Sequence, residues 1–138
     1  MSIKVGMCGT GSFARHFIPL FKAHPDVEKV VLCDLDENKL KDSCDTFGIT
    51  ATCKSLDELC RSDVDAIVII TQHHLHGPQA VQALKAGKHV YSAVPSAISM
   101  EEITERGWAV SSSCAIVRHE FLRNGRNGHS AGIGAKCR

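Results

Sequence analysis

Ile3-Lys-Val-Gly-Met-Cys-Gly-Thr-Gly-Ser-Phe-Ala14 is the most informative stretch of this sequence. Its first six residues form a short apolar run, which predicts a buried strand. Gly9 and Gly11 follow at once and predict a tight turn. From Phe13 the apolar residues recur at helical spacing until about Lys22, before the dipeptide His24-Pro25 breaks the pattern. The stretch therefore predicts a strand, a turn and a helix in direct succession.

The small residues of this turn each have a mechanical role. Gly9 permits the tight turn, Gly11 lets the backbone approach a pyrophosphate without an intervening Cβ, and Ala14 lets the helix pack closely on the strand. The pattern is the G-x-G-x-x-A fingerprint of dinucleotide-binding folds, in which phosphates meet free N–H groups at the start of the helix. The alternative is that the glycines serve only the turn. The residues predicted to hold the pyrophosphate are Gly9, Thr10, Gly11, Ser12, Phe13 and Ala14.

Asp34 strengthens the dinucleotide interpretation. It follows the β-rich run Val30-Val-Leu-Cys33 and lies 20 residues after Ala14, where a carboxylate can accept hydrogen bonds from the adenosine ribose. The same carboxylate repels a 2′-phosphate, and the next residues, Leu35-Asp36-Glu37, supply no arginine to bind one. NAD is therefore the expected cofactor, and NADP is less favoured. Alternatively, Asp34 only caps a helix.

Strands and helices alternate along the following residues. This rhythm predicts a doubly wound, Rossmann-type parallel α/β sheet with strand order 3-2-1-4-5, spanning residues 1–107. The segments that support it are a helix with the stripe Leu40, Cys44 and Phe47 closed by Gly48, a strand over Thr50–Cys53, a capping box over Ser55–Glu58, a buried strand over Ala66–Ile70, a helix through Ala80, Val81 and Leu84 to Gly87, a strand over Lys88–Tyr91, and a second capping box over Ser99–Glu102.

Residues 108–138 are expected to form an irregular tail, although Cys114 to Val117 could be a short sixth strand. Residues 118–138 hold five Lys and Arg against one acidic residue, which indicates a solvated basic tail rather than a nucleic-acid platform. The seven cysteines include no Cys-x-x-Cys pair, so neither a disulfide framework nor a zinc ribbon is predicted. No long apolar run or signal-peptide core appears, and a cytoplasmic protein without membrane partners is expected.

Thr71-Gln-His-His-Leu-His76 follows the fourth predicted strand, at the edge where open parallel sheets bind ligands. We expect Thr71, His73 and His76 to line the crevice between adenosine and nicotinamide. A zinc site is not predicted, because neighbouring histidines cannot easily converge on one ion. Each histidine could serve as an acid or base, or only as a capping or surface residue.

Together these residues resemble the amino-terminal NAD(P)-binding domain of the glucose-fructose oxidoreductase, inositol dehydrogenase and MocA (Gfo/Idh/MocA) family, over roughly residues 3–105. The resemblance rests on the glycine loop, Asp34, the run Leu84-Lys-Ala-Gly-Lys-His-Val-Tyr91 and the Thr71 to His76 segment. The family motif T-P-N-x-x-H keeps Thr71 and His76, while Gln72 and His73 replace the Pro and Asn. The family motif E-K-P reads Ala93-Val94-Pro95, which implies that Pro95 lies near the nicotinamide and that the family's catalytic lysine has no counterpart.

The resemblance implies a hydride transfer between nicotinamide and a sugar, polyol or similar hydroxyl or ketone substrate. It also implies a second, substrate-binding domain, for which 138 residues leave no room. Truncation, alternative splicing or a shifted reading frame near Gly107 are the explanations that we expect for this difference. Because the catalytic lysine and the second domain have no counterpart here, we do not expect this chain to catalyse the reaction alone. The alternatives are a non-catalytic dinucleotide-binding sensor or partner module, an inactive fragment and, less favoured, a methyl-donor-binding fold. The substrate and a homo-oligomeric state stay open.

Overall fold

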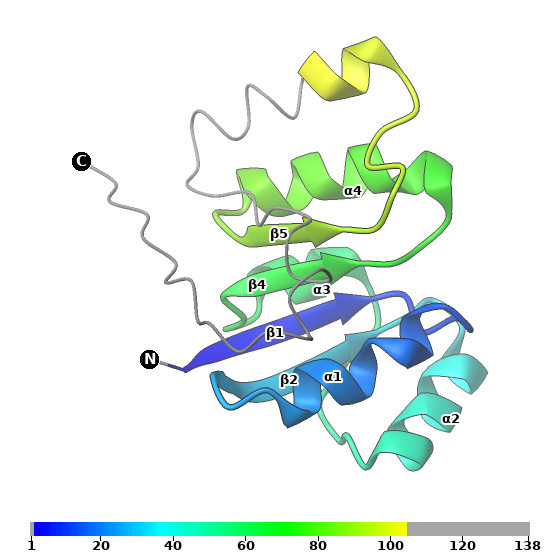
Figure 1. Cartoon of the computed structure of the whole chain (residues 1–138), viewed down its shortest axis with the longest axis vertical. Helices are drawn as coiled ribbons and strands as arrows, with labels where there is room; N and C mark the ends of the chain where they lie inside the picture. The colour runs from blue at the N-terminus through cyan, green and yellow to red at the C-terminus, as the bar shows by residue number, and fades with distance from the viewer. Residues whose placement is uncertain (1, 105–138) are drawn as a thin grey trace, which may run out of the picture.

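The computed structural model describes residues 2–104 of the chain (Figure 1). The predicted tail over residues 108–138, with its candidate strand at Cys114 to Val117, lies outside the described residues, as does the domain boundary at residue 107. Within residues 2–104, none of the helices has the length and hydropathy that crossing a bilayer requires.

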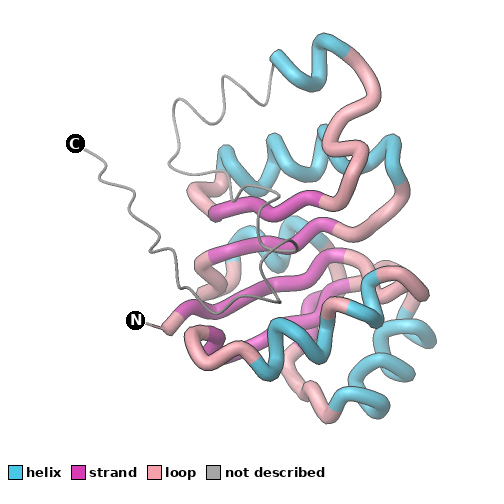
Figure 2. The backbone as a smooth tube through the Cα atoms, viewed as in Figure 1, coloured by secondary structure: helices cyan, strands magenta, loops and turns pink. Residues whose placement is uncertain are grey.

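Five parallel strands form the sheet (Figure 2). Their order, β3-β2-β1-β4-β5, confirms the predicted topology. Gly6 in the central strand lies opposite Val31 on one side and Ile67 on the other. The strands are β1 (Ile3–Cys8), β2 (Val27–Cys33), β3 (Thr52–Cys53), β4 (Ala66–Ile69) and β5 (His89–Ser92).

The structure confirms the predicted helix end at Gly48 and the predicted helix starts at Ser55 and Ser99. The Asp36 side chain caps α2 (Glu37–Phe47) by accepting from two backbone amides, and Gly48 ends that helix in the left-handed conformation. Ser55 caps α3 (Leu56–Arg61), and α4 (His73–Lys85) connects β4 to β5. A further helical segment occupies residues 100–104, where the Ser99 hydroxyl accepts from the Glu102 amide at 3.2 Å.

The single helix expected from Phe13 to Lys22 is wrong. The structure divides this segment into a 3-10 turn, η1 (Ala14–His16), and a separate short helix, α1 (Ile18–Ala23). Pro19 explains the division, because proline has no N–H to donate and is accommodated in the first turn of a helix. An α-helix therefore begins again around Pro19 instead of running through it.

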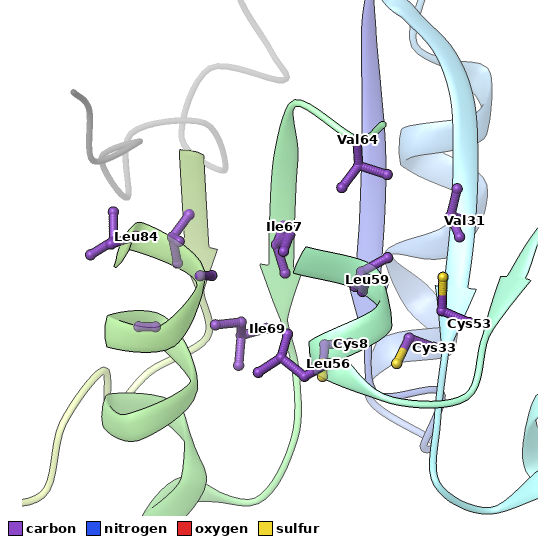
Figure 3. Close-up of a cluster of buried hydrophobic side chains, with 13 residues drawn as sticks. Cys8, Val31, Cys33, Cys53, Leu56, Leu59, Val64, Ile67, Ile69 and Leu84 are labelled. Carbon is purple, nitrogen blue, oxygen red and sulfur yellow. The ribbon is translucent and has the colours of Figure 1, made fainter. Parts of the chain in front are cut away.

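Helices cover both faces of the sheet, giving three layers (Figure 1). On one face, Met7 of β1 and Leu32 of β2 pack in one cluster with Ile18 of α1 and Leu40 of α2. On the other face, Ile67 and its neighbours pack against α3 and α4 (Figure 3). Alternate residues of each strand thus enter opposite cores, which is why β4 is apolar at every position.

Candidate functional site

A crevice of about 750 Å³ opens at the carboxyl ends of the strands. It lies where the strand order reverses, between β1 and β4, which is the usual ligand position in open parallel sheets. Nine of the eleven predicted site residues line it: Gly9, Gly11, Ser12, Phe13, Ala14, Asp34, Thr71, His73 and His76. The other two, Thr10 and Pro95, are not among the lining residues.

Gly9 is required by the fold itself. Its φ of +100° lies in the region that favours glycine, and its amide donates to the Cys33 carbonyl at 2.8 Å. A Cβ at this position would overlap the carbonyl group of Ile70, with the carbonyl carbon only 2.8 Å away. Gly9 therefore makes the turn from β1 possible while β4 passes close by.

Gly11 is not required by the packing of the described residues. A Cβ added here would meet no atom within 4 Å, and Gly11 has no positive φ. The position instead faces the crevice. Within the described part of the chain, the amides of Gly11, Ser12 and Phe13 donate no hydrogen bond to another residue. The loop thus offers unused N–H donors beside open space.

Asp34 and Thr10 are joined by two hydrogen bonds. The Thr10 amide and hydroxyl both donate to Asp34 Oδ2, each at 2.8 Å, and the Asp36 amide donates to Asp34 Oδ1 at 2.9 Å. Thr10 is only 1% exposed. Its side chain therefore faces Asp34, although the fingerprint suggested a direct role in binding pyrophosphate.

Two further charged side chains, Asp36 and Lys39, lie close to Asp34 at the edge of the crevice. The amides of Lys39 and Asn38 donate to Asp36, and this hydrogen bonding holds the pKa of the Asp36 carboxyl below its usual range. Among the described residues that line the crevice, Lys39 is the one lysine or arginine, and its ammonium lies 3.5 Å from an Asp36 oxygen. Leu35 is exposed between the two aspartates.

Cys8 and Cys33 form part of the crevice lining. They are paired in register on β1 and β2, and their sulfurs lie on the same side of the sheet (Figure 3). The neighbouring Cys8 thiol, together with burial, raises the pKa of Cys33 far above its ordinary value. This thiol is therefore uncharged, and it contributes a neutral surface beside the glycine loop.

The histidines of the Thr71 to His76 segment have different environments. His73 is exposed at the start of α4 and lines the crevice, with its ring centroid 5.7 Å from that of His76. His76 is 1% exposed; its Nδ1 lies 2.7 Å from the Pro95 oxygen and its Nε2 3.0 Å from the Thr71 oxygen. A neutral imidazole donates to one of these carbonyls, and a doubly protonated ring donates to both.

His76 therefore ties the end of β4 to the segment after β5. Pro95 does not line the crevice, and its contact with the site runs through its carbonyl oxygen, which lies against His76. Val94, directly before it, lines the crevice with a side chain that is 64% exposed. Within residues 2–104, no group of three or more His, Cys, Asp or Glu side chains is arranged to hold a metal ion.

Sequence reasoning missed several lining residues. Lys39 could have been found, because it lies one helical turn after the Asp36 cap and so returns to the same rim. Cys8 and Cys33 could also have been found, since each ends a strand directly before a loop residue of the site. Leu56 and Gln79 come from α3 and α4, and no local pattern places them here.

The sheet order, the glycine loop at the reversal point and the carboxylate after β2 define a nucleotide-binding Rossmann domain. The chain belongs to the Gfo/Idh/MocA family, described as an oxidoreductase family with an NAD-binding Rossmann fold, whose sequence model matches residues 3–119. It is the NAD(P)-binding domain of that family, as the resemblance predicted.

The similar proteins include sugar-nucleotide enzymes. The dTDP-3,4-didehydro-2,6-dideoxy-alpha-D-glucose 3-reductase of Streptomyces violaceoruber is 31% identical over 86% of this chain and 37% of its own length. The WlbA dehydrogenase of Bordetella pertussis, solved with NADH and UDP-GlcNAcA, is 27% identical with a TM-score of 0.74, covering 81% of this chain and 35% of its own.

A 3-ketoreductase of Actinomadura kijaniata, solved with TDP-benzene and NADP, shares the fold with a TM-score of 0.74. It is 24% identical, and the match covers 81% of this chain and 36% of its own. The neighbours thus include complexes with NADH and a complex with NADP. This chain spans about a third of the length of the curated relatives that it matches.

Proposed function

We propose that the crevice binds NAD in preference to NADP. The pyrophosphate would meet the free amides of Gly11, Ser12 and Phe13, and the adenosine ribose would meet Asp34. Thr71, His73 and His76 would lie along the path toward the nicotinamide, with Pro95 held behind them by His76. The pyrophosphate position rests on general chemistry, because consecutive unpaired backbone N–H groups form a concave site for anions.

The observation that carries this proposal is the open space at Gly11. Glycine is costly in conformational entropy unless something requires it, and nothing in the described packing requires Gly11. A ligand that comes close to the backbone supplies the missing reason. The unpaired amides of Gly11, Ser12 and Phe13 point to the same kind of ligand, because N–H donors attract the negatively charged oxygens of a pyrophosphate.

Two carboxylates support the preference for NAD. Asp34 has three hydrogen bonds from its own chain and still has acceptor capacity for a ribose hydroxyl. A 2′-phosphate would meet the charge of Asp34 and that of Asp36. Lys39 is the group that would attract such a phosphate, but Asp36 already pairs with it.

Calorimetric titration of the chain with NAD and NADP tests the proposal. We expect NAD to bind more tightly than NADP. We expect Asp34→Ala to weaken NAD binding and to reduce the difference in affinity between NAD and NADP. Asp45→Ala removes a carboxylate from an exposed position on α2 and provides the matched control. A folded chain that binds no NAD, or an Asp34→Ala variant with unchanged NAD affinity, would refute the proposal.

We further propose that this domain serves an oxidoreductase acting on a hydroxyl or ketone group of a sugar, polyol or related compound. The reductase and dehydrogenase relatives support this substrate class. When bound, the nicotinamide would supply or accept the hydride. The described residues would bind and orient the cofactor, with His73 the exposed titratable side chain on the α4 side of the crevice.

Val94 favours a second candidate, a non-catalytic dinucleotide-binding module. Its side chain carries no proton to transfer and no charge to place beside a substrate. Formation of NADH on incubation with NAD and a panel of polyols and sugars distinguishes the two functions. Turnover that Gly11→Val abolishes would support the enzyme, and NAD binding without turnover would support the module. Homo-oligomer formation and the cytoplasmic location stay predictions.

A further inference from the structure

Thr10 lies in the glycine loop, but its side chain is turned away from the crevice. The side chain is buried, and its hydroxyl donates to Asp34 Oδ2 at 2.8 Å. The Thr10 amide donates to the same oxygen, so this N–H is not available to a phosphate. Both donors of Thr10 thus act on the carboxylate at the end of β2, across the gap between two adjacent strands.

The contacts of Asp34 fix how its two oxygens are used. A carboxylate offers about four acceptor positions on its two oxygens. Thr10 supplies two donors to Oδ2, and the Asp36 amide supplies one to Oδ1. Oδ2 is therefore saturated by the protein, and Oδ1 keeps a free acceptor position. A ribose hydroxyl can be accepted only there while the other three hydrogen bonds persist.

We propose that Thr10 is a positioning residue that sets dinucleotide selectivity through Asp34. Its hydroxyl holds Oδ2 against the loop and so presents Oδ1 at a fixed orientation toward the ribose. Hydrogen bonding to a ribose hydroxyl depends steeply on orientation, whereas repulsion of a 2′-phosphate depends mainly on distance. Loss of the Thr10 hydroxyl should therefore weaken NAD binding more than NADP binding.

This inference rests on the proposed NAD site, and one set of titrations tests both. Thr10→Val keeps the β-branched shape and the amide but removes the hydroxyl, and Thr10→Ser keeps the hydroxyl. We expect Thr10→Val to raise the Kd for NAD by about five- to tenfold and the Kd for NADP by less than about twofold. Thr10→Ser should restore NAD affinity to within about twofold of wild type.

Three further variants guard against misfolding and against a merely structural role of Thr10. If a methyl group beside the carboxylate prevents Thr10→Val from folding, Thr10→Ala removes the hydroxyl without adding bulk. In an Asp34→Ala background, Thr10→Val should have no further effect on NAD affinity, because a positioning residue acts only through its partner. Thr50→Val, at an exposed position after α2, is the control for replacing threonine by valine.

The possible failures are distinguishable. If the wild-type chain binds neither dinucleotide, the proposed function fails and this inference fails with it. If the wild type binds NAD but Thr10→Val keeps its affinity and its ratio of NAD to NADP, only the role of Thr10 is overturned. An equal loss of both dinucleotides in Thr10→Val, or an additive effect in the Asp34→Ala background, would also overturn it.

Discussion

Gly9 and Gly11, two residues apart in one loop, should respond in opposite ways to the same substitution. In Gly9→Ala the new methyl group overlaps the Ile70 carbonyl group, and alanine must adopt a φ of +100°. Backbone strain of this kind costs of order 1–3 kcal/mol, and steric overlap in a packed region costs about as much again. We expect Gly9→Ala to lose roughly 3 kcal/mol or more of unfolding free energy.

Gly11→Ala should leave stability unchanged or slightly raised. Its methyl group meets no atom within 4 Å, and φ there is not positive. Replacing glycine at such a position stabilises proteins by about 0.4–1 kcal/mol, because it reduces the freedom of the unfolded chain. The same methyl group, however, enters the space assigned to the pyrophosphate. We expect NAD affinity to fall at least tenfold, or about 1.4 kcal/mol.

Urea unfolding followed by far-ultraviolet circular dichroism measures the stability of both variants, and calorimetry measures NAD binding. The two effects should separate, with stability lost in Gly9→Ala and NAD binding lost in Gly11→Ala. A Gly11→Ala variant destabilised by more than about 1 kcal/mol, or one that binds NAD like the wild type, would refute this assignment of roles. The first result would mean that the fold requires Gly11, and the second that the ligand does not approach it.

Three further substitutions test local features of the fold. Ser43→Ala should stabilise the chain by up to about 1 kcal/mol in urea unfolding, because the Ser43 hydroxyl is fully buried with no hydrogen-bond partner among the described residues; a loss of stability would show that the hydroxyl has a partner. Lys88→Met should cost about 1–3 kcal/mol, since the ammonium donates to the carbonyls of Ser62 and Val64, each at 2.8 Å; an unchanged urea midpoint would contradict this. Amide donors lower the pKa of the Asp36 carboxyl, so the charged cap stabilises α2 at pH values above the unfolded pKa of about 3.9, and this contribution is lost as pH falls through the lower folded pKa. Any advantage in thermal stability of the wild type over Asp36→Asn at pH 7 should therefore shrink as the pH is lowered to about 2, and curves that stay parallel over this range would contradict it.

The strand order and most helix ends could be predicted from sequence because their signals are local. Gly48 and Ser55 end and begin helices through their own backbone and side-chain chemistry, and unbroken apolar strands require cover on both faces. The division of the first helix was equally local, since Pro19 stood in the sequence, but the apolar spacing around it outweighed the missing amide in the prediction.

The orientation of side chains in the candidate site could not be predicted in the same way. The fingerprint placed Thr10 and Asp34 in one site. The direction of the Thr10 hydroxyl, however, depends on a contact with Asp34, which lies 24 residues away in the sequence and is brought close by the pairing of β1 with β2. The link from His76 to Pro95 likewise joins residues 19 positions apart. Such contacts arise from tertiary packing, which spacing along the chain does not encode.

The central position of β1 has a consequence for how the chain folds during synthesis. β1 leaves the ribosome first, yet one of its two partners, β4, is made about sixty residues later, when Ala66 can pair beside Val5. At synthesis rates of roughly 5–20 residues per second, one edge of β1 stays unpaired for several seconds. During that interval the unpaired edge of β1 can pair with a wrong strand, so the nascent chain is exposed to aggregation until β4 is made.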